Sequence, residues 1–248
     1  MLRTHQLPEG SPTAKGQAVV NLISNDNDER VEAILPIEEF EEDRYLVMAT
    51  RNGIIKRTEL TAYENVHSGG IIALTLKEGD ELIDVELTGG EDHLFLTSRQ
   101  GQSIRFNEAD ARAIGRTAMG VIGIRLEGDD EVVEMEVIPE WDVNHPDESE
   151  LTVLTITENG YGKRTPIAEY RDQSRGGKGL ITMKVNDRNG PVVGARLVDE
   201  TDELMLITDD GQLIRCPVED ISTYGRNTQG GKVMVTSEDE KVVSMARI

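Results

Sequence analysis

The sequence contains little that would support disulfide, metal or membrane chemistry. Only one of its 248 residues is a cysteine, Cys216, so an intramolecular disulfide is excluded. No apolar run approaches the ~20 residues that a membrane-spanning helix needs, and the opening MLRTHQLPEG has no apolar signal-peptide core. The histidines are scattered without metal-ligand spacing: His5, His67, His93 and His145. We therefore expect a soluble cytoplasmic protein that binds no metal, no other cofactor and no membrane.

Positive charge is also scarce. The chain has 26 lysines and arginines against 47 aspartates and glutamates, which gives a formal net charge of −21. Taken alone, this balance points away from nucleic acid, but a net charge does not locate the basic residues. Hydrophobic residues make up 37% of the chain and are interleaved with the charged ones, which argues against disorder.

The chain contains an internal repeat of about fifty residues. Four segments read Thr or Ser, two polar residues and Gly, followed by an apolar and basic run. Their glycines are Gly53, Gly101, Gly160 and Gly211. Asn52-Gly53, Asn159-Gly160 and Asp210-Gly211 predict two-residue hairpin turns of type I′, and the flanking runs such as YLVMAT are short and apolar.

A second glycine alternates with the first and opens another apolar run in each repeat. These anchor glycines are Gly16, Gly70, Gly120, Gly179 and Gly230. An aliphatic pair follows each anchor glycine, most loosely at Val31-Glu32, so that every repeat has four candidate strands. A unit of this size with four strands is typical of a propeller blade, and we predict an all-β, propeller-like fold of about five blades.

We interpret residues 1–248 as a single domain. The predicted units are approximately 1–40, 41–90, 91–140, 150–200 and 201–248, and residues 137–150 form an acidic insert. The opening MLRT matches IKRT and GKRT, so the first unit is expected to be incomplete, as in a fragment. Trp141 in the insert either packs over its own loop or binds a partner.

Basic residues recur at one position of the repeat. An arginine lies four residues after each turn glycine, and two lysines precede these arginines: Arg57, Arg105, Arg164 and Arg215, with Lys56 and Lys163. Such a line along successive blades fits the phosphate backbone of DNA. The alternative is that each arginine pairs with a carboxylate of its own blade, and the spacing does not decide between the two.

The loop from Gln173 to Gly179 is rich in glycine and flanked by charge. Gly176, Gly177 and Gly179 would allow close approach of a phosphate, with Arg175 and Lys178 supplying charge. A flexible turn between blades is the alternative interpretation. Arg116 and Arg226, each in a Gly-Arg pair, are further candidates for DNA contact.

With these residues the sequence resembles the C-terminal DNA-wrapping domain of the bacterial DNA gyrase A subunit, which is related to topoisomerase IV. The segments that carry the resemblance include QLPEGSPTAKGQAVVNL, AIGRTAMGVIGIRL, TENGYGKRTPIAEY and GRNTQGG. The family's signature box, Gln-Arg-Arg-Gly-Gly-Lys-Gly, belongs to its first blade. Here residues 173–179 match that form in a later blade, with Ser174 in place of a basic residue.

The resemblance implies a β-pinwheel, a propeller whose blades exchange strands, with a basic rim that bends DNA without reading its sequence. It implies a monomeric, non-catalytic module of an ATP-dependent type II topoisomerase whose catalytic tyrosine lies in another domain. Its partners would be double-stranded DNA, the rest of gyrase A, and gyrase B at the bacterial nucleoid. The alternative function is a protein-interaction module that uses its acidic surface.

Overall fold

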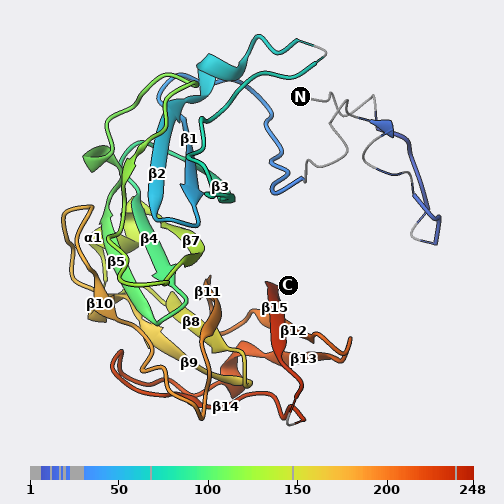
Figure 1. Cartoon of the computed structure of the whole chain (residues 1–248), viewed down its shortest axis with the longest axis vertical. Helices are drawn as coiled ribbons and strands as arrows, with labels where there is room; N and C mark the ends of the chain where they lie inside the picture. Colours follow the sequence, from blue (N-terminus) through green and yellow to red (C-terminus); the bar gives the residue numbers. More distant parts are fainter. Residues whose placement is uncertain are drawn as a thin grey trace.

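The chain folds into antiparallel sheets that follow one another around an arc (Figure 1). The computed structural model describes residues 7–11, 13–16, 18, 21–22, 31–67, 69–146, 148–237 and 239–248. Within these residues three sheets have four strands and the last has three. No helix in this part of the chain is long and apolar enough to cross a membrane. The expected all-β, propeller-like fold is confirmed.

Each repeat contributes a hairpin and a later third strand. The hairpins are β1 (Tyr45–Thr50) with β2 (Ile54–Glu59), β4 (His93–Ser98) with β5 (Gln102–Asn107), β8 (Thr152–Thr157) with β9 (Tyr161–Pro166), and β12 (Glu203–Thr208) with β13 (Leu213–Pro217). The third strands are β3 (Leu82–Thr88), β7 (Val132–Ile138), β11 (Val192–Val198) and β15 (Val242–Arg247). Two-residue strands follow three of the anchor glycines: β6 (Val121–Ile122), β10 (Leu180–Ile181) and β14 (Gly231–Lys232).

Short helices complete the described secondary structure. A 3-10 helix follows each hairpin: η3 (Leu60–Tyr63), η4 (Glu108–Asp110), η5 (Ile167–Glu169) and η6 (Val218–Asp220). One α-helix, α1 (Glu140–Asn144), lies in the acidic insert.

The hairpins turn at the predicted glycines but not with the predicted turn type. In the first turn, Gly53 has a φ of 79° and donates its N–H to the carbonyl of Thr50 at 2.9 Å. The other three turn glycines repeat this bond. Type I′ also needs a positive φ at the residue before the glycine, and Asp43 is the sole non-glycine with positive φ among the described residues. The first three connections have three residues and the last, between β12 and β13, has four, and in each the glycine alone takes the left-handed conformation.

Neighbouring repeats exchange their outer strands. β6 follows β5 in the chain, yet it pairs with β2 of the preceding repeat, where Ile55 faces Val121. In the same way β10 pairs with β5, and β14 pairs with β9. The exchange implied by the resemblance is confirmed. β6, β10 and β14 form the outer edge of the arc, whereas β3, β7, β11 and β15 lie on its concave side (Figure 1).

Two predicted strands are not formed within the described residues. Residues 69–76 and the pair Val31-Glu32 have no strand assignment. A strand after an anchor glycine needs the preceding hairpin as its partner, and for Gly70 the repeat places that hairpin at residues 1–4. Those residues, which carry the predicted hairpin tail MLRT, lie outside the described part. The proposed unit boundaries, including the partial unit 1–40, stay a prediction.

The cores lie between successive sheets. Val47 and Ile55 of the first sheet pack with Leu96 and Ile104 of the second, and all four side chains are fully buried. Between the second and third sheets, Phe95 packs edge-to-face on Tyr170, with ring centroids 4.8 Å apart. Since each sheet buries its faces against its neighbours, the repeats stabilise one another.

We expect Gly53→Ala to destabilise the domain by about 3 kcal/mol, because a left-handed φ and a backbone clash combine. A Cβ at Gly53 would lie 2.7 Å from the carbonyl oxygen of Ile124, just beyond β6. Gly211 is the matched control, since its φ is 81° but a Cβ there would have open space. Gly211→Ala should cost only about 1 kcal/mol in urea denaturation. Equal losses of unfolding free energy in the two variants would contradict a close backbone contact between Gly53 and the exchanged strand.

Candidate nucleic-acid interface

The outer edge of the arc carries an arginine at the same place in three consecutive repeats. Arg116, Arg175 and Arg226 each lie four residues before an anchor glycine, and all three side chains are partly exposed. Each donates from Nη1 to the carbonyl oxygen of an isoleucine in the preceding repeat. The acceptors and distances are Ile72 at 3.0 Å for Arg116, Ile122 at 3.1 Å for Arg175, and Ile181 at 2.8 Å for Arg226.

This contact fixes the guanidinium groups without neutralising them. The acceptors are backbone carbonyls, and in the described residues none of the three arginines has a carboxylate within ion-pair distance. A guanidinium has five N–H donors, so one carbonyl bond leaves others available. The edge therefore presents a row of positioned positive charges.

The box-like loop packs along the edge of the preceding repeat. Gly176 donates its N–H to the carbonyl of Gly123 at 2.6 Å, and Gly177 accepts from the N–H of Arg125 at 2.8 Å. Gln173 donates its N–H to the carbonyl of Arg105 at 2.9 Å. Gly176 and Gly179 have φ of 74° and 78°, which only glycine adopts readily. The loop is therefore an ordered junction and not a free turn.

The two charged side chains of this loop differ in their surroundings. Arg175 donates from Nε to the carbonyl of Asp110 at 2.8 Å, in addition to its bond to Ile122. Lys178 is largely exposed and pairs with Glu127. The hydrogen bond and charge of Lys178 lower the pKa of Glu127.

Three of the arginines at the turn +4 position are buried, which corrects the expectation of an exposed line. Arg57 Nε lies 3.0 Å from Glu108 Oε2, and its guanidinium stacks on the Tyr45 ring. Arg164 donates to the carbonyl of Ile221 at 2.6 Å and to Glu200 at 2.9 Å. Such groups face the junction between blades and do not present a charge to solvent.

Arg105 and Arg215 complete the series. Arg105 is also buried, and this burial lowers its pKa. Arg215 differs, since it is exposed on the last hairpin and pairs with Glu203 of the same hairpin. The alternative of carboxylate pairing within the same blade thus holds for Arg164 with Glu200 and for Arg215 with Glu203, while Arg57 pairs with a carboxylate of the next repeat.

Lys56 and Lys163 are buried behind the outer edge, and this too corrects the expectation of exposure. Lys163 donates to the carbonyl of Gly225 at 2.6 Å, to Thr228 Oγ1 at 3.0 Å and to the carbonyl of Arg226. Lys56 donates to the carbonyls of Ala73 and Arg116. Burial lowers the pKa of each lysine to about 8. These lysines position the loops that carry Arg116 and Arg226.

Two further basic residues of the edge are not among the DNA contacts predicted from the sequence. Arg125 and Lys184 lie five residues after Gly120 and Gly179, and both are exposed. Their backbone N–H groups bond to Gly177 and Thr228, which places them beside the loops of the next repeat. A fixed offset from the anchor glycine, like the offset of four from the turn glycine, is the signal that identifies them.

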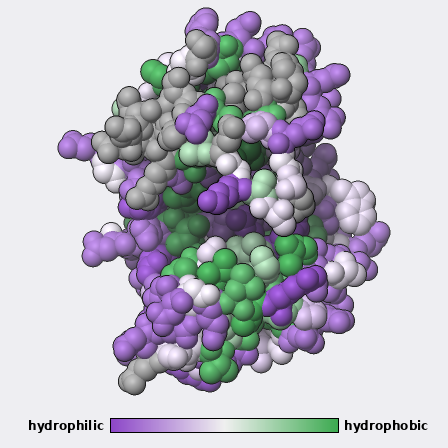
Figure 2. All heavy atoms as spheres, turned by 90° about the vertical axis from the view of Figure 1, so that its right-hand side faces the viewer, coloured by the Kyte–Doolittle hydropathy of each residue, from purple (hydrophilic) through white to green (hydrophobic). Residues whose placement is uncertain are grey.

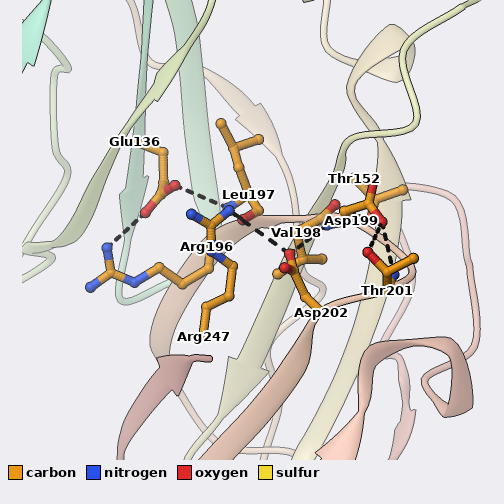
Figure 3. A network of polar contacts seen from close by, with 9 residues as sticks. All are labelled: Glu136, Thr152, Arg196, Leu197, Val198, Asp199, Thr201, Asp202 and Arg247. Carbon is orange, nitrogen blue, oxygen red and sulfur yellow. Dashed lines mark hydrogen bonds and ion pairs between the residues drawn. The ribbon is translucent and has the colours of Figure 1, made fainter.

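Acidic residues gather on the concave side. Glu134 and Glu136 of β7 pair with Arg196 of β11 at 3.0 and 2.8 Å, and Asp84 and Glu86 of β3 adjoin them. Figure 3 shows the Glu136–Arg196 pair beside Arg247. This side of the molecule is hollowed (Figure 2), and a cavity of about 500 Å³ lies among the inner strands. This carboxylate cluster therefore lies on the opposite side of the sheets from the row of Arg116, Arg175 and Arg226.

The acidic insert places its tryptophan at the surface. Trp141 is 53% exposed, and its ring stacks on His145 of the same loop with centroids 4.9 Å apart. Asp142, Glu148 and Asp199 line a pocket beside it. The contact with its own loop is observed, and a binding role stays a prediction.

Comparison with known proteins relates all of these repeats to one family. The family described as "DNA gyrase C-terminal domain, beta-propeller" matches residues 44–88, 92–139, 152–199 and 202–248. The DNA gyrase A subunit of Salmonella typhimurium is 48% identical over 247 residues, which cover 100% of this chain and 27% of that protein. The corresponding protein of Clostridium acetobutylicum is 47% identical, with 100% and 29% covered. The chain thus spans about a quarter of the length of these relatives.

Solved structures agree with this relationship. The C-terminal domain of DNA topoisomerase IV superimposes with a TM-score of 0.88 at 27% identity, covering 98% of this chain and 74% of that one. The C-terminal domain of DNA gyrase A gives a TM-score of 0.80 at 26% identity, with 94% and 75% covered. Since the family match includes all four described repeats, the chain belongs to the DNA gyrase C-terminal domain family.

Proposed function

We propose that this domain binds duplex DNA along its outer edge and bends it, without catalysing a reaction itself. The observation that carries the proposal is the row formed by Arg116, Arg175 and Arg226, each fixed to the preceding repeat. Cations on a curved surface bind the duplex by neutralising phosphates and releasing counterions, which requires no base contacts. The arc supplies the curvature, and added phosphate contacts offset the cost of bending.

Arg125, Lys178 and Lys184 extend this surface, since all three are exposed beside the same loops. Buried basic residues behind this surface hold its loops and blade junctions in place, namely Arg57, Arg105, Arg164, Lys56 and Lys163. In the holoenzyme the domain would wrap DNA for a type II topoisomerase and contribute to negative supercoiling. The rest of gyrase A and gyrase B would be its partners, and the catalytic tyrosine and ATP hydrolysis would belong to those parts.

The test is the salt dependence of duplex binding by a triple variant, Arg116→Gln, Arg175→Gln and Arg226→Gln. With a duplex of about 40 base pairs, each lost phosphate contact should reduce the slope of log K against log salt by about 0.9. Affinity should fall by about 10- to 100-fold, to a similar extent for unrelated sequences. Glutamine retains a donor for the backbone carbonyl, so the loops should keep their positions.

The matched control removes three other arginines that are at least partly exposed, Arg51, Arg99 and Arg247, which pair with carboxylates away from the outer edge. It changes the net charge equally and should leave the slope nearly unchanged. Equal slopes for the wild type and the edge variant would refute the proposed interface. If the wild type failed to bind at low salt, the acidic surface would become the better candidate, as a site for a basic protein partner.

A further inference from the structure

The outer edge exposes an isoleucine beside each of its positioned arginines. Ile72, Ile122 and Ile181 each lie two residues after an anchor glycine and are 62%, 43% and 38% exposed. These are the residues whose carbonyls accept the bonds from Arg116, Arg175 and Arg226. An apolar side chain and a guanidinium therefore recur together at three successive positions along the edge.

In β6 and β10 the alternation of the strand accounts for the outward direction of Ile122 and Ile181, whereas Ile72 lies in a segment without strand assignment. The residues before two of the isoleucines face inward, since Ile71 and Val121 pack against core clusters. Successive side chains of a strand point to opposite faces, so the next residue must point away from the core. Polar residues are the usual choice at such positions on an exposed edge strand. The position two residues after Gly230 follows that rule, since it holds Lys232.

Isolated apolar residues at a surface need no explanation, but these three are not isolated. They share one repeat position, lie on one edge and adjoin the groups to which the proposed function assigns phosphate contact. A DNA minor groove combines these two chemistries, because arginine is drawn to its negative potential while isoleucine packs on its floor and walls. Apolar wedges in the minor groove also unstack base steps and bend the duplex.

We propose that Ile72, Ile122 and Ile181 enter the minor groove of the bound duplex and help to bend it. This inference rests on the proposed DNA binding and adds a contact that does not depend on charge. The arginines set the salt dependence of DNA binding, and the isoleucines increase the affinity by the same factor at every salt concentration through buried apolar surface. Because the three sites are one repeat apart, they meet the duplex at separate places along the arc.

The experiment compares the wild type with a triple variant, Ile72→Ser, Ile122→Ser and Ile181→Ser, on a duplex labelled at both ends for energy transfer. We expect affinity to fall by about 10-fold at every salt concentration, since apolar burial is lost, while the salt slope stays the same. The end-to-end distance should increase, because the wedges no longer assist the bend. A minor-groove dye should be displaced by the wild type and less by the variant.

The control variant, Val243→Ser with Ile248→Ser, removes exposed apolar side chains away from the outer edge, and it should behave as the wild type. Melting temperatures of all variants establish that each is folded. Serine variants that bind, bend and displace the dye as the wild type does would overturn the inference. Failure of the wild type itself to bind would instead overturn the proposed function, so the two outcomes are distinct.

Discussion

Replacing Glu108 with alanine should destabilise the domain by about 3 to 5 kcal/mol, because it leaves a buried cation and several buried hydrogen-bond donors without a partner. The carboxylate of Glu108 is completely buried. It accepts hydrogen bonds from Thr88 Oγ1 at 2.6 Å, from the N–H of Gly90 at 2.8 Å and from the N–H of Asp92 at 3.1 Å. Arg57 adds an ion pair at 3.0 Å.

These groups come from both sides of a junction between repeats. Arg57 is on β2 of the first sheet, whereas Glu108 follows β5 of the second. Alanine would leave the Arg57 guanidinium buried without its carboxylate, and no other acid among the described residues lies within ion-pair distance to take its place. The loss is therefore a desolvation cost at the junction and not only the loss of one contact.

Urea denaturation followed by circular dichroism measures the loss, and Glu203→Ala is its matched control. Glu203 pairs with Arg215, which occupies the repeat position of Arg57, but this pair is exposed to solvent. An exposed ion pair contributes about 1 kcal/mol or less, so the control should be nearly as stable as the wild type. Similar losses in the two variants would argue against a special role for the buried junction.

The contrast between Arg57 and Arg215 also marks how far sequence reasoning reaches. The repeat, the hairpins and the third strands follow from local signals, since a glycine with positive φ between apolar runs leaves the backbone few alternatives. Burial of an arginine is not a local property. It depends on whether the next repeat brings a carboxylate such as Glu108 to the same junction, and spacing within one repeat carries no such information.

The candidate interface likewise combines features that follow from local sequence with features that depend on a neighbouring repeat. The offset from the anchor glycine identifies Arg116, Arg175 and Arg226 as equivalent, but nothing in their spacing predicts a bond to the carbonyl of the preceding repeat. That contact exists because the outer strand is exchanged, which places the loop of one repeat on the edge of another. The predicted turn type is wrong for a related reason. Asn-Gly favours type I′, yet Asn52 instead donates its N–H to Asp80 at 3.0 Å, a contact from outside the hairpin.

A second large effect is expected from pH, through the carboxylates on the concave side. Burial, together with the charge of acidic neighbours and against the opposing charge of Arg196, raises the pKa of Glu134 to about 8 and that of Glu86 to about 7. The usual value for either group is 4.5. At pH values between the usual pKa and the raised pKa, these carboxyl groups keep protons in the folded domain that they have released in the unfolded chain. The contribution of these groups to stability must therefore fall as the pH rises.

For Glu134 alone, the free energy of unfolding should fall by about 3 kcal/mol between about pH 5.5 and 8.5, at about 1.4 kcal/mol per pH unit below its pKa. Urea denaturation at several pH values measures this slope. Other carboxylates oppose the trend only at lower pH, since hydrogen bonds lower the pKa of Asp199 and Glu240. Lys56 and Lys163, whose pKa burial lowers to about 8, oppose the trend near and above pH 8. The comparison therefore belongs above about pH 5 and is made as a difference between the wild type and a variant at Glu134, in which both lysines titrate equally.

Glu134→Gln separates this effect from other titrations. Glutamine keeps an acceptor for Arg196 Nη2, which lies 3.0 Å from Glu134 Oε1, but it cannot ionise. Buried His93, whose pKa is lowered by desolvation, titrates equally in both proteins and cancels in the difference. The variant should lose less stability than the wild type as the pH rises and should be the more stable of the two at high pH, while Glu148→Gln at the surface should follow the wild type.

Parallel curves of unfolding free energy against pH for the wild type and Glu134→Gln would mean that the inner carboxylates ionise freely. The concave side would then be as well solvated as the surface, against the burial that the packing of β3, β7 and β11 imposes on it.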